Sequence, residues 1–182
     1  KALLVKAAGS LLEVCRYLQD DLELPAVSSH QANGQPCRKH KSHAIDWCHV
    51  RGQALAKRAL MLACAGGHNV VLRGAPGTGK TLLAHGVASM LPDLQSAEKI
   101  DVMLVHAMRG DTALPTQRPF RQPHHSASYA AMVGGGQPLM PGEVSMAHHG
   151  VLFLDEWPEF KPSVLNSLRE PLESGCVYLA RA

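Results

Sequence analysis

Apolar residues near the start of the chain recur at helical spacing and predict a helical segment within residues 1–24. Ser10 is a candidate N-cap for this helix, and Pro25 ends the pattern. We expect the segment to be the remnant of a preceding N-terminal domain. Its apolar stripe consists of Leu11, Leu12, Val14, Cys15 and Leu18.

Residues 25–49 have no such periodicity and are rich in Ser, His, Gly, Pro and Lys, a composition typical of a linker. Four His and Cys side chains within 37–48 are candidate zinc ligands, but their spacing matches no standard zinc finger. A solvated basic linker is the plainer interpretation, and zinc is the alternative. The four residues are Cys37, His40, His43 and Cys48.

Helix-like and strand-like apolar runs alternate from residue 50 to the end of the chain. Between them, the stretch 110–150 is rich in Gly and Pro and predicts long loops or insertions. Strands separated by helices favour a parallel sheet flanked by helices, so we expect an α/β fold over 50–182. The predicted helices span 53–65, 80–91 and 163–173, and the predicted short strands span 70–72, 151–154 and 177–179.

The composition narrows the class of protein. Hydrophobic residues make up 46% of the chain and charged residues 18%, which provides for a buried core and excludes a disordered polyelectrolyte. The net charge of +3 permits a polyanionic partner without requiring one. The longest uncharged run, 122–142, is full of His, Ser, Gly and Pro, so we expect no membrane partner. Five irregularly spaced cysteines suggest reduced thiols and a cytoplasmic location.

The strongest motif is the phosphate loop at 74–81, which fits G-x-x-x-x-G-K-[ST] at every fixed position. Its glycines let backbone N–H groups turn towards phosphates, and the following helix directs its positive end at the same anion. We expect Lys80 to reach the β- and γ-phosphates and Thr81 to ligate Mg²⁺. The motif therefore predicts ATP and Mg²⁺ as cofactors. Its residues are Gly74, Ala75, Pro76, Gly77, Thr78, Gly79, Lys80 and Thr81.

A second motif is the apolar strand 151–154 that ends in two acids, Asp155 and Glu156. A strand of this kind places its carboxylates at the edge of the sheet beside the phosphate loop. Asp155 suits contact with Mg²⁺ through water, and Glu156 suits polarising the attacking water as the catalytic base. Glu143 is the next candidate for that base.

Longer segments resemble the ComM/YifB family of magnesium-chelatase-like AAA+ ATPases, and they occur in the family's order. The segments PHHSAS and PGE are far more specific than either nucleotide motif. The resemblance departs from the family at His149, usually a small residue or Asn, and at Trp157, usually Leu. The matching segments are AGGHN (65–69), the phosphate loop, RPFR (118–121), PHHSAS (123–128), VGGG (133–136), PGE (141–143), AH (147–148), GVLFLDE (150–156), PEF (158–160) and REPLESG (169–175).

The resemblance implies a P-loop AAA+ core that assembles into a ring, a hexamer, and acts on DNA in branch migration during natural transformation. It implies that residues 50–53 lie near the adenine and that 100–150 include insertions facing the working surface of the ring. Residues 3–24 resemble the end of a Lon-protease-type N-terminal domain. The sensor, the arginine finger and the helical lid of the family are expected beyond Ala182, so the predicted core lacks its lid and is expected to hydrolyse ATP weakly by itself.

Three functions stay open at this point. The first is an ATP-driven DNA motor, which the segment 118–156 favours. The second is a magnesium-chelatase ATPase subunit of tetrapyrrole synthesis, and the third is an assembly module that binds ATP without useful turnover. The pairs His124–His125 and His148–His149 fit structural hydrogen bonds near the nucleotide or contacts to metal or DNA.

Overall fold

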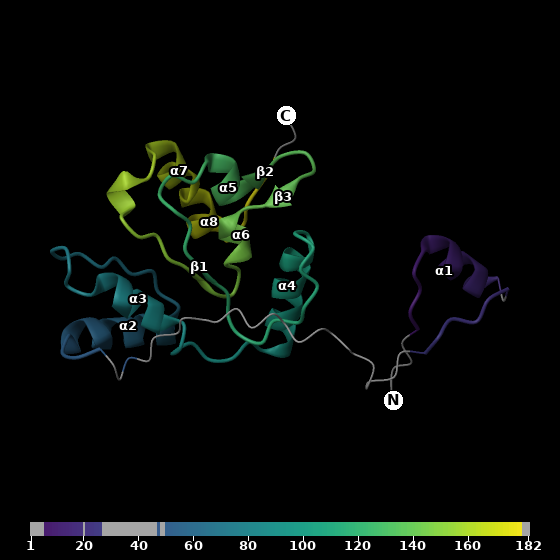
Figure 1. The fold of residues 1–182 in the computed structure, drawn as a ribbon, viewed down its shortest axis with the longest axis horizontal. Helices are drawn as coiled ribbons and strands as arrows, with labels where there is room; N and C mark the ends of the chain where they lie inside the picture. The colour runs from purple at the N-terminus through teal and green to yellow at the C-terminus, as the bar shows by residue number, and fades with distance from the viewer. Residues whose placement is uncertain (1–5, 20, 27–46, 48–49, 180–182) are drawn as a thin grey trace. The chain divides into compact units, whose positions relative to one another are not determined.

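The computed structural model describes residues 6–19, 21–26, 47 and 50–179 (Figure 1). The chain divides into two compact units, residues 1–38 and 39–182. The candidate zinc ligands of the linker, Cys37, His40, His43 and Cys48, lie outside the described residues.

The first unit contains one helix, α1 (Leu11–Leu18), among its described residues. Ser10 caps it as predicted, because its hydroxyl accepts a hydrogen bond from the Glu13 N–H at 3.3 Å. The helix ends at Leu18, well before Pro25. An isolated antiparallel bridge joins Lys6 to Ala26, so the chain beyond the helix turns back alongside the chain before it.

In the second unit, helices α2 (Ala54–Gly66) and α3 (Lys80–Val87) pack against each other around a small core (Figure 1). Gly67 ends α2 in the left-handed conformation, with φ of 64°, that favours glycine. Helix α3 begins at the predicted residue but ends four residues early. Ser89 is the cause, since its hydroxyl bonds the Gly86 carbonyl at 2.8 Å in a turn that competes with the helix. The buried residues of this core are Val50, Leu60 and Leu83.

Helix α4 (Ser96–Ala107) was not predicted. The Glu98 carboxylate accepts a hydrogen bond from the Gln95 N–H at 2.8 Å, which satisfies a backbone donor at the start of the helix. Val102, only 1% exposed, anchors the buried side of the helix. The sequence therefore does contain a signal for the start of this helix, a Gln followed three residues later by a Glu.

Two short strand pairs form among the described residues. Strand β1 (Phe120–Arg121) pairs in parallel with β4 (Val151–Leu152), with Phe120 opposite Val151. Strand β2 (Gly134–Gly135) pairs antiparallel with β3 (Met140–Pro141). Of the predicted parallel sheet, the described residues form one pair of strands, β1 and β4. The strand predicted at 151–154 is shorter than expected, since β4 covers two residues.

The main core gathers four short helices and a turn of 3₁₀ helix in the C-terminal third of the chain (Figure 1). The region 110–150, expected to be loops, contributes two of these helices. Five buried side chains form the centre of the core: Met132, Val133, Phe160, Val164 and Leu168. The elements are α5 (Tyr129–Val133), α6 (Glu143–Met146), the 3₁₀ turn η2 (Trp157–Glu159), α7 (Pro162–Ser167) and α8 (Arg169–Ser174).

The predicted strands 70–72 and 177–179 are wrong. An extended segment becomes a strand only by hydrogen bonding to a neighbour, and neither segment pairs with another part of the chain that the structure describes. Val71 is 92% exposed. The predicted helix 163–173 is two helices, α7 and α8. Pro171 explains the break, because it has no N–H to donate to the Ser167 carbonyl four residues earlier.

The helices of residues 6–19 and 50–179 are all too short to cross a bilayer, which takes about 20 apolar residues.

Candidate nucleotide-binding site

The phosphate loop connects an extended segment to the start of α3. Gly77 and Gly79 adopt φ of 76° and 82°, values that favour glycine. The Thr78 hydroxyl donates a hydrogen bond to the Ala75 carbonyl at 2.9 Å and thereby closes the loop on itself. A tight loop of this kind, directly followed by a helix N-terminus, is a geometry that suits an anion.

Lys80 is the first residue of α3, and its side chain lies across the loop. The ammonium Nζ donates to the carbonyls of Gly74 at 2.9 Å and Ala75 at 2.8 Å. The positive charge of Lys80 is therefore held over the turn at which the motif predicts that the β- and γ-phosphates bind. The lysine is also the group on this loop that carries a full positive charge.

Thr81 and Asp155 lie 74 residues apart in the sequence and meet at the base of the loop. The Thr81 hydroxyl donates to Oδ2 of Asp155 at 3.0 Å, in a half-buried position. The other carboxylate oxygen, Oδ1, accepts a hydrogen bond from the Glu156 N–H at 3.0 Å. The structure thus brings together the two residues that the sequence assigns to Mg²⁺, both of which offer hard oxygen atoms.

Glu156 projects from the same turn, and its side chain is 65% exposed. Its backbone is left-handed, with φ of 52°, a conformation that costs a non-glycine residue about 1–3 kcal/mol and tends to occur at functional sites. Nδ1 of His125 lies 3.4 Å from its carboxylate. The segment PHHSAS therefore reaches the candidate base directly, a contact that spacing along the sequence does not reveal.

Gln53 also contacts the loop. Its side-chain amide donates to the Thr78 carbonyl at 3.2 Å, and its backbone is left-handed with φ of 56°. Val50, which the resemblance places with it near the adenine, is buried in the core with Leu60. Sequence reasoning gave no role to the Gln53 side chain, because a lone Gln before a helix carries no specific signal.

Glu143, the second candidate for the base, is held by two arginines. Its carboxylate, 16% exposed, lies 2.6 Å from Nε of Arg121 and 3.1 Å from NH1 of Arg109. Burial acts to raise the pKa of Glu143, but the hydrogen bonds and charges of Arg121 and Arg109 outweigh it and leave the pKa below its usual range. A carboxylate so fully paired is a weak proton acceptor, so Glu143 is a poor base.

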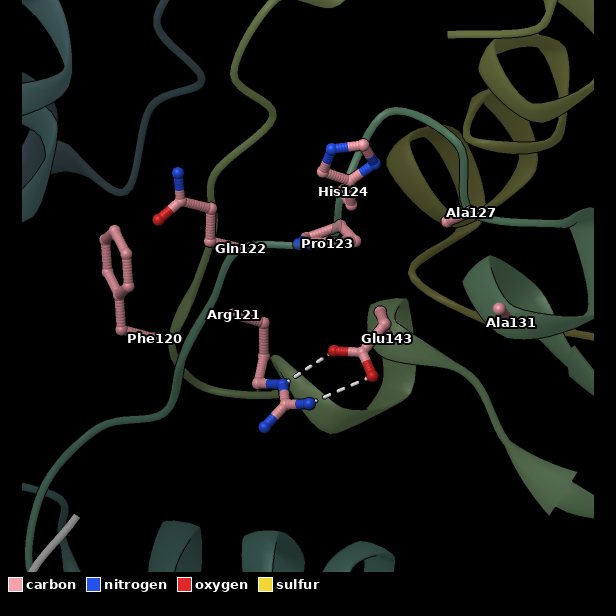
Figure 2. Close-up of a pocket in the computed structure, with 8 residues that line it drawn as sticks. All are labelled: Phe120, Arg121, Gln122, Pro123, His124, Ala127, Ala131 and Glu143. Atoms are coloured by element: carbon pink, nitrogen blue, oxygen red, sulfur yellow. Dashed lines mark hydrogen bonds and ion pairs between the residues drawn. The ribbon is translucent and has the colours of Figure 1, made fainter.

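Figure 2 shows this ion pair on one side of an open pocket of about 430 Å³. His124 lies on the far side of the pocket from the Arg121 guanidinium, and Ala127 and Ala131 line its flank. The phosphate loop contributes none of the pocket's lining residues. The pocket is therefore a feature of the segment 120–131 and Glu143, apart from the loop that carries the nucleotide motif.

Residues 46–182 match the family described as magnesium chelatase, subunit ChlI. The chain belongs to this family. Membership of this family suggests a P-loop fold. The small parallel sheet and its helices are consistent with that fold.

Individual proteins are similar to this chain over most of its length. The uncharacterized protein YifB of Escherichia coli K12 is 50% identical over 177 residues, which are 96% of this chain and 34% of YifB. The competence protein ComM of Haemophilus influenzae is 43% identical over 178 residues, 96% of this chain and 35% of ComM. Lon protease 2 of Bacillus subtilis is 30% identical over 143 residues, 73% of this chain and 26% of that protein. The chain thus spans about a third of YifB and of ComM, and the predicted ComM/YifB resemblance is confirmed.

Proposed function

We propose that this chain binds Mg·ATP and hydrolyses it, and that the whole protein couples hydrolysis to the remodelling of DNA within a hexameric ring. The observation that carries the proposal is the Thr81–Asp155 hydrogen bond, which joins the start of α3 to the turn after β4. Membership of the magnesium chelatase family and the similarity to ComM, a competence protein, support it.

Each residue of the site has a distinct part in this chemistry. Lys80 holds the β- and γ-phosphates by charge, while the backbone N–H groups of the loop orient them. Thr81 and Asp155 would hold Mg²⁺, which when bound neutralises charge developing on the transferred phosphoryl group. Glu156 orients the attacking water and accepts its proton. His125 positions the Glu156 carboxylate.

Two other functions compete with DNA remodelling. The matching family is named after a magnesium chelatase subunit, which favours an ATPase that serves a chelatase. A module that binds ATP and assembles without turnover would need the loop but not the base. The three proposals differ in how ATP turnover responds to DNA.

The first experiment separates nucleotide binding from hydrolysis. Lys80→Ala should abolish detectable Mg·ATP binding in a folded protein, because the charge on the phosphates is lost. Glu156→Gln should bind ATP within about twofold of the unchanged chain, or about 0.4 kcal/mol, while any turnover falls by about 10²–10⁴-fold. Fluorescence polarisation of a labelled ATP measures binding, and phosphate release measures turnover.

Lys161→Ala is the matched control, since this exposed lysine lies at the start of α7, away from the loop. If folded Lys80→Ala binds Mg·ATP with normal affinity, the assignment of the phosphate loop as the nucleotide site is wrong. Addition of single-stranded or branched DNA then separates the functions: faster turnover supports the DNA motor, unaltered turnover favours the chelatase type, and binding without turnover favours the assembly module.

A further inference from the structure

Asp101 of α4 and the two histidines of the turn before β4 form a cluster of metal-binding side chains. One ligand atom from each of Asp101, His148 and His149 lies within 4.8 Å of the others. Nε2 of His149 is 3.1 Å from Oδ2 of Asp101, and the two imidazole rings lie 4.0 Å apart between centroids. The cluster is separate from the nucleotide site, and the role proposed above does not use it.

One of these distances matches the spacing of ligand atoms around a tetrahedral metal. Bonds of about 2.0–2.1 Å to nitrogen and oxygen place neighbouring ligand atoms about 3.3 Å apart. The His149–Asp101 pair is already at such a separation, and the ligand atom of His148 lies within 4.8 Å of both. Asp101 is 52% exposed, so water can supply the fourth position.

Glu98 faces the other side of the His149 ring. The other ring nitrogen of His149, Nδ1, faces Oε1 of Glu98 at 3.7 Å. Glu98 is itself fixed, since Arg118 donates to Oε2 at 2.9 Å and the Gln95 N–H donates to the same oxygen at 2.8 Å. Histidines that ligate metals usually have a carboxylate on their second nitrogen, which sets the tautomer and raises the basicity of the ligand.

The backbone contributes to this arrangement. His149 is left-handed, with φ of 54°, so its ring is directed towards α4 by a conformation that few residues other than Gly, Asn and Asp adopt readily. Burial, and then the neighbouring His149, lower the pKa of His148.

We propose that Asp101, His148 and His149 bind a borderline transition metal, of the class of Zn²⁺, with Glu98 as the second-layer carboxylate. Two imidazoles and one carboxylate suit such an ion, whereas Mg²⁺ prefers a shell of oxygens. The bound metal would fasten α4 to the turn that leads into β4 and the acidic residues after it.

The test is a titration of the chain with Zn²⁺ by calorimetry. The parent carries Cys37→Ser and Cys48→Ser, so that linker thiols do not compete for zinc. We expect about one equivalent to bind, and His149→Asn and Asp101→Asn each to weaken binding by about tenfold or more, since losing even a second-layer partner typically costs 10–100-fold. Asn accepts the left-handed backbone at 149, so that variant should fold.

The matched control is His124→Asn. His124 and His125 stack at the same centroid separation of 4.0 Å, and a carboxylate, that of Glu156, is again nearby. This variant should bind Zn²⁺ like the parent. The proposal is overturned if the parent binds no Zn²⁺, or if His149→Asn and Asp101→Asn, both folded by circular dichroism, bind it as tightly as the parent does.

Discussion

Three residues other than glycine adopt a left-handed backbone in residues 50–179: Gln53, His149 and Glu156. Each directs its side chain at a neighbour that bears on function. Gln53 bonds the phosphate loop, Glu156 faces His125, and His149 faces two carboxylates of α4. Strained conformations of this kind cost about 1–3 kcal/mol and persist where the surroundings impose them. At the scale of single residues, strain therefore coincides with the proposed nucleotide and metal sites.

The pairing of Glu143 with Arg109 and Arg121 gives a prediction for stability against pH. Glu143→Gln should lower the free energy of unfolding at pH 7 by about 1.5–3 kcal/mol, the range for hydrogen bonds to charged groups. The value should lie at the lower end, because the arginine side chains are 31% and 32% exposed. Because the pKa of Glu143 is lowered in the folded state, its contribution is complete above about pH 4.3 and is lost as pH falls through the folded pKa.

Urea unfolding at neutral and acidic pH measures this effect. The difference in unfolding free energy between the unchanged chain and Glu143→Gln should shrink below about pH 4. Glu173→Gln is the control, since Glu173 is 73% exposed and pairs with Arg169 at 3.7 Å on the surface of α8. A surface pair of this kind contributes little. A difference for Glu143→Gln that is equal at every pH would contradict the assigned pairing.

The residues of the nucleotide motifs could be predicted because their chemistry depends on local spacing. The positions of Lys80 and Thr81 are set by the glycines before them, and Asp155 follows from an apolar run that ends in acids. Gln53 and His125 could not be found in this way. Their contacts join segments 25 and 31 residues apart, and no local pattern specifies such a distance.

Among the elements, the parallel pair of β1 and β4 depends on a close approach at Gly150. A Cβ added there would collide with the Pro119 carbonyl, the group that accepts the Val151 N–H at 2.8 Å. We predict that Gly150→Ala lowers the free energy of unfolding by about 1–3 kcal/mol or more, the usual cost of overpacking. The substitution should also weaken Mg·ATP binding, because β4 leads to Asp155.

Thermal unfolding followed by circular dichroism measures the first effect, and polarisation of labelled ATP the second. Gly66→Ala is the control. An alanine Cβ at that position would meet only the ring of His68, an exposed side chain that can move aside. If Gly150→Ala is as stable as Gly66→Ala, the pairing of β1 with β4 does not depend on the close approach of Gly150 to the Pro119 carbonyl.

Helices were easier to predict than strands, for a physical reason. A helix satisfies its own hydrogen bonds, so α2 and α3 begin within one residue of their predicted starts. A strand needs a partner elsewhere in the chain, and the apolar run 70–72 has none among residues 6–19, 21–26, 47 and 50–179. Helix α4 was missed because its buried side is narrow: Val102 is buried, while Ile100 and Leu104 are exposed.

For the whole molecule, the open nucleotide site favours assembly. The carboxylate of Glu156, the candidate base, is mostly exposed. Water around a reacting group weakens the electrostatic interactions that stabilise a transition state. A neighbouring copy of the chain would cover the site, as the proposed ring requires.

The corresponding prediction is that turnover depends on protein concentration. Where a neighbour supplies an arginine to the developing charge, that residue raises the rate by about 10³–10⁵-fold. In the whole protein, the ATPase rate per chain should therefore rise with concentration until the ring is complete. Light scattering should show assembly with Mg·ATP, most stably for Glu156→Gln, which keeps its nucleotide, and not for Lys80→Ala, which fails to bind it. A rate per chain that stays constant over the same concentrations, in a protein that binds ATP, would mean that one chain holds a complete site and that the ring proposal is wrong.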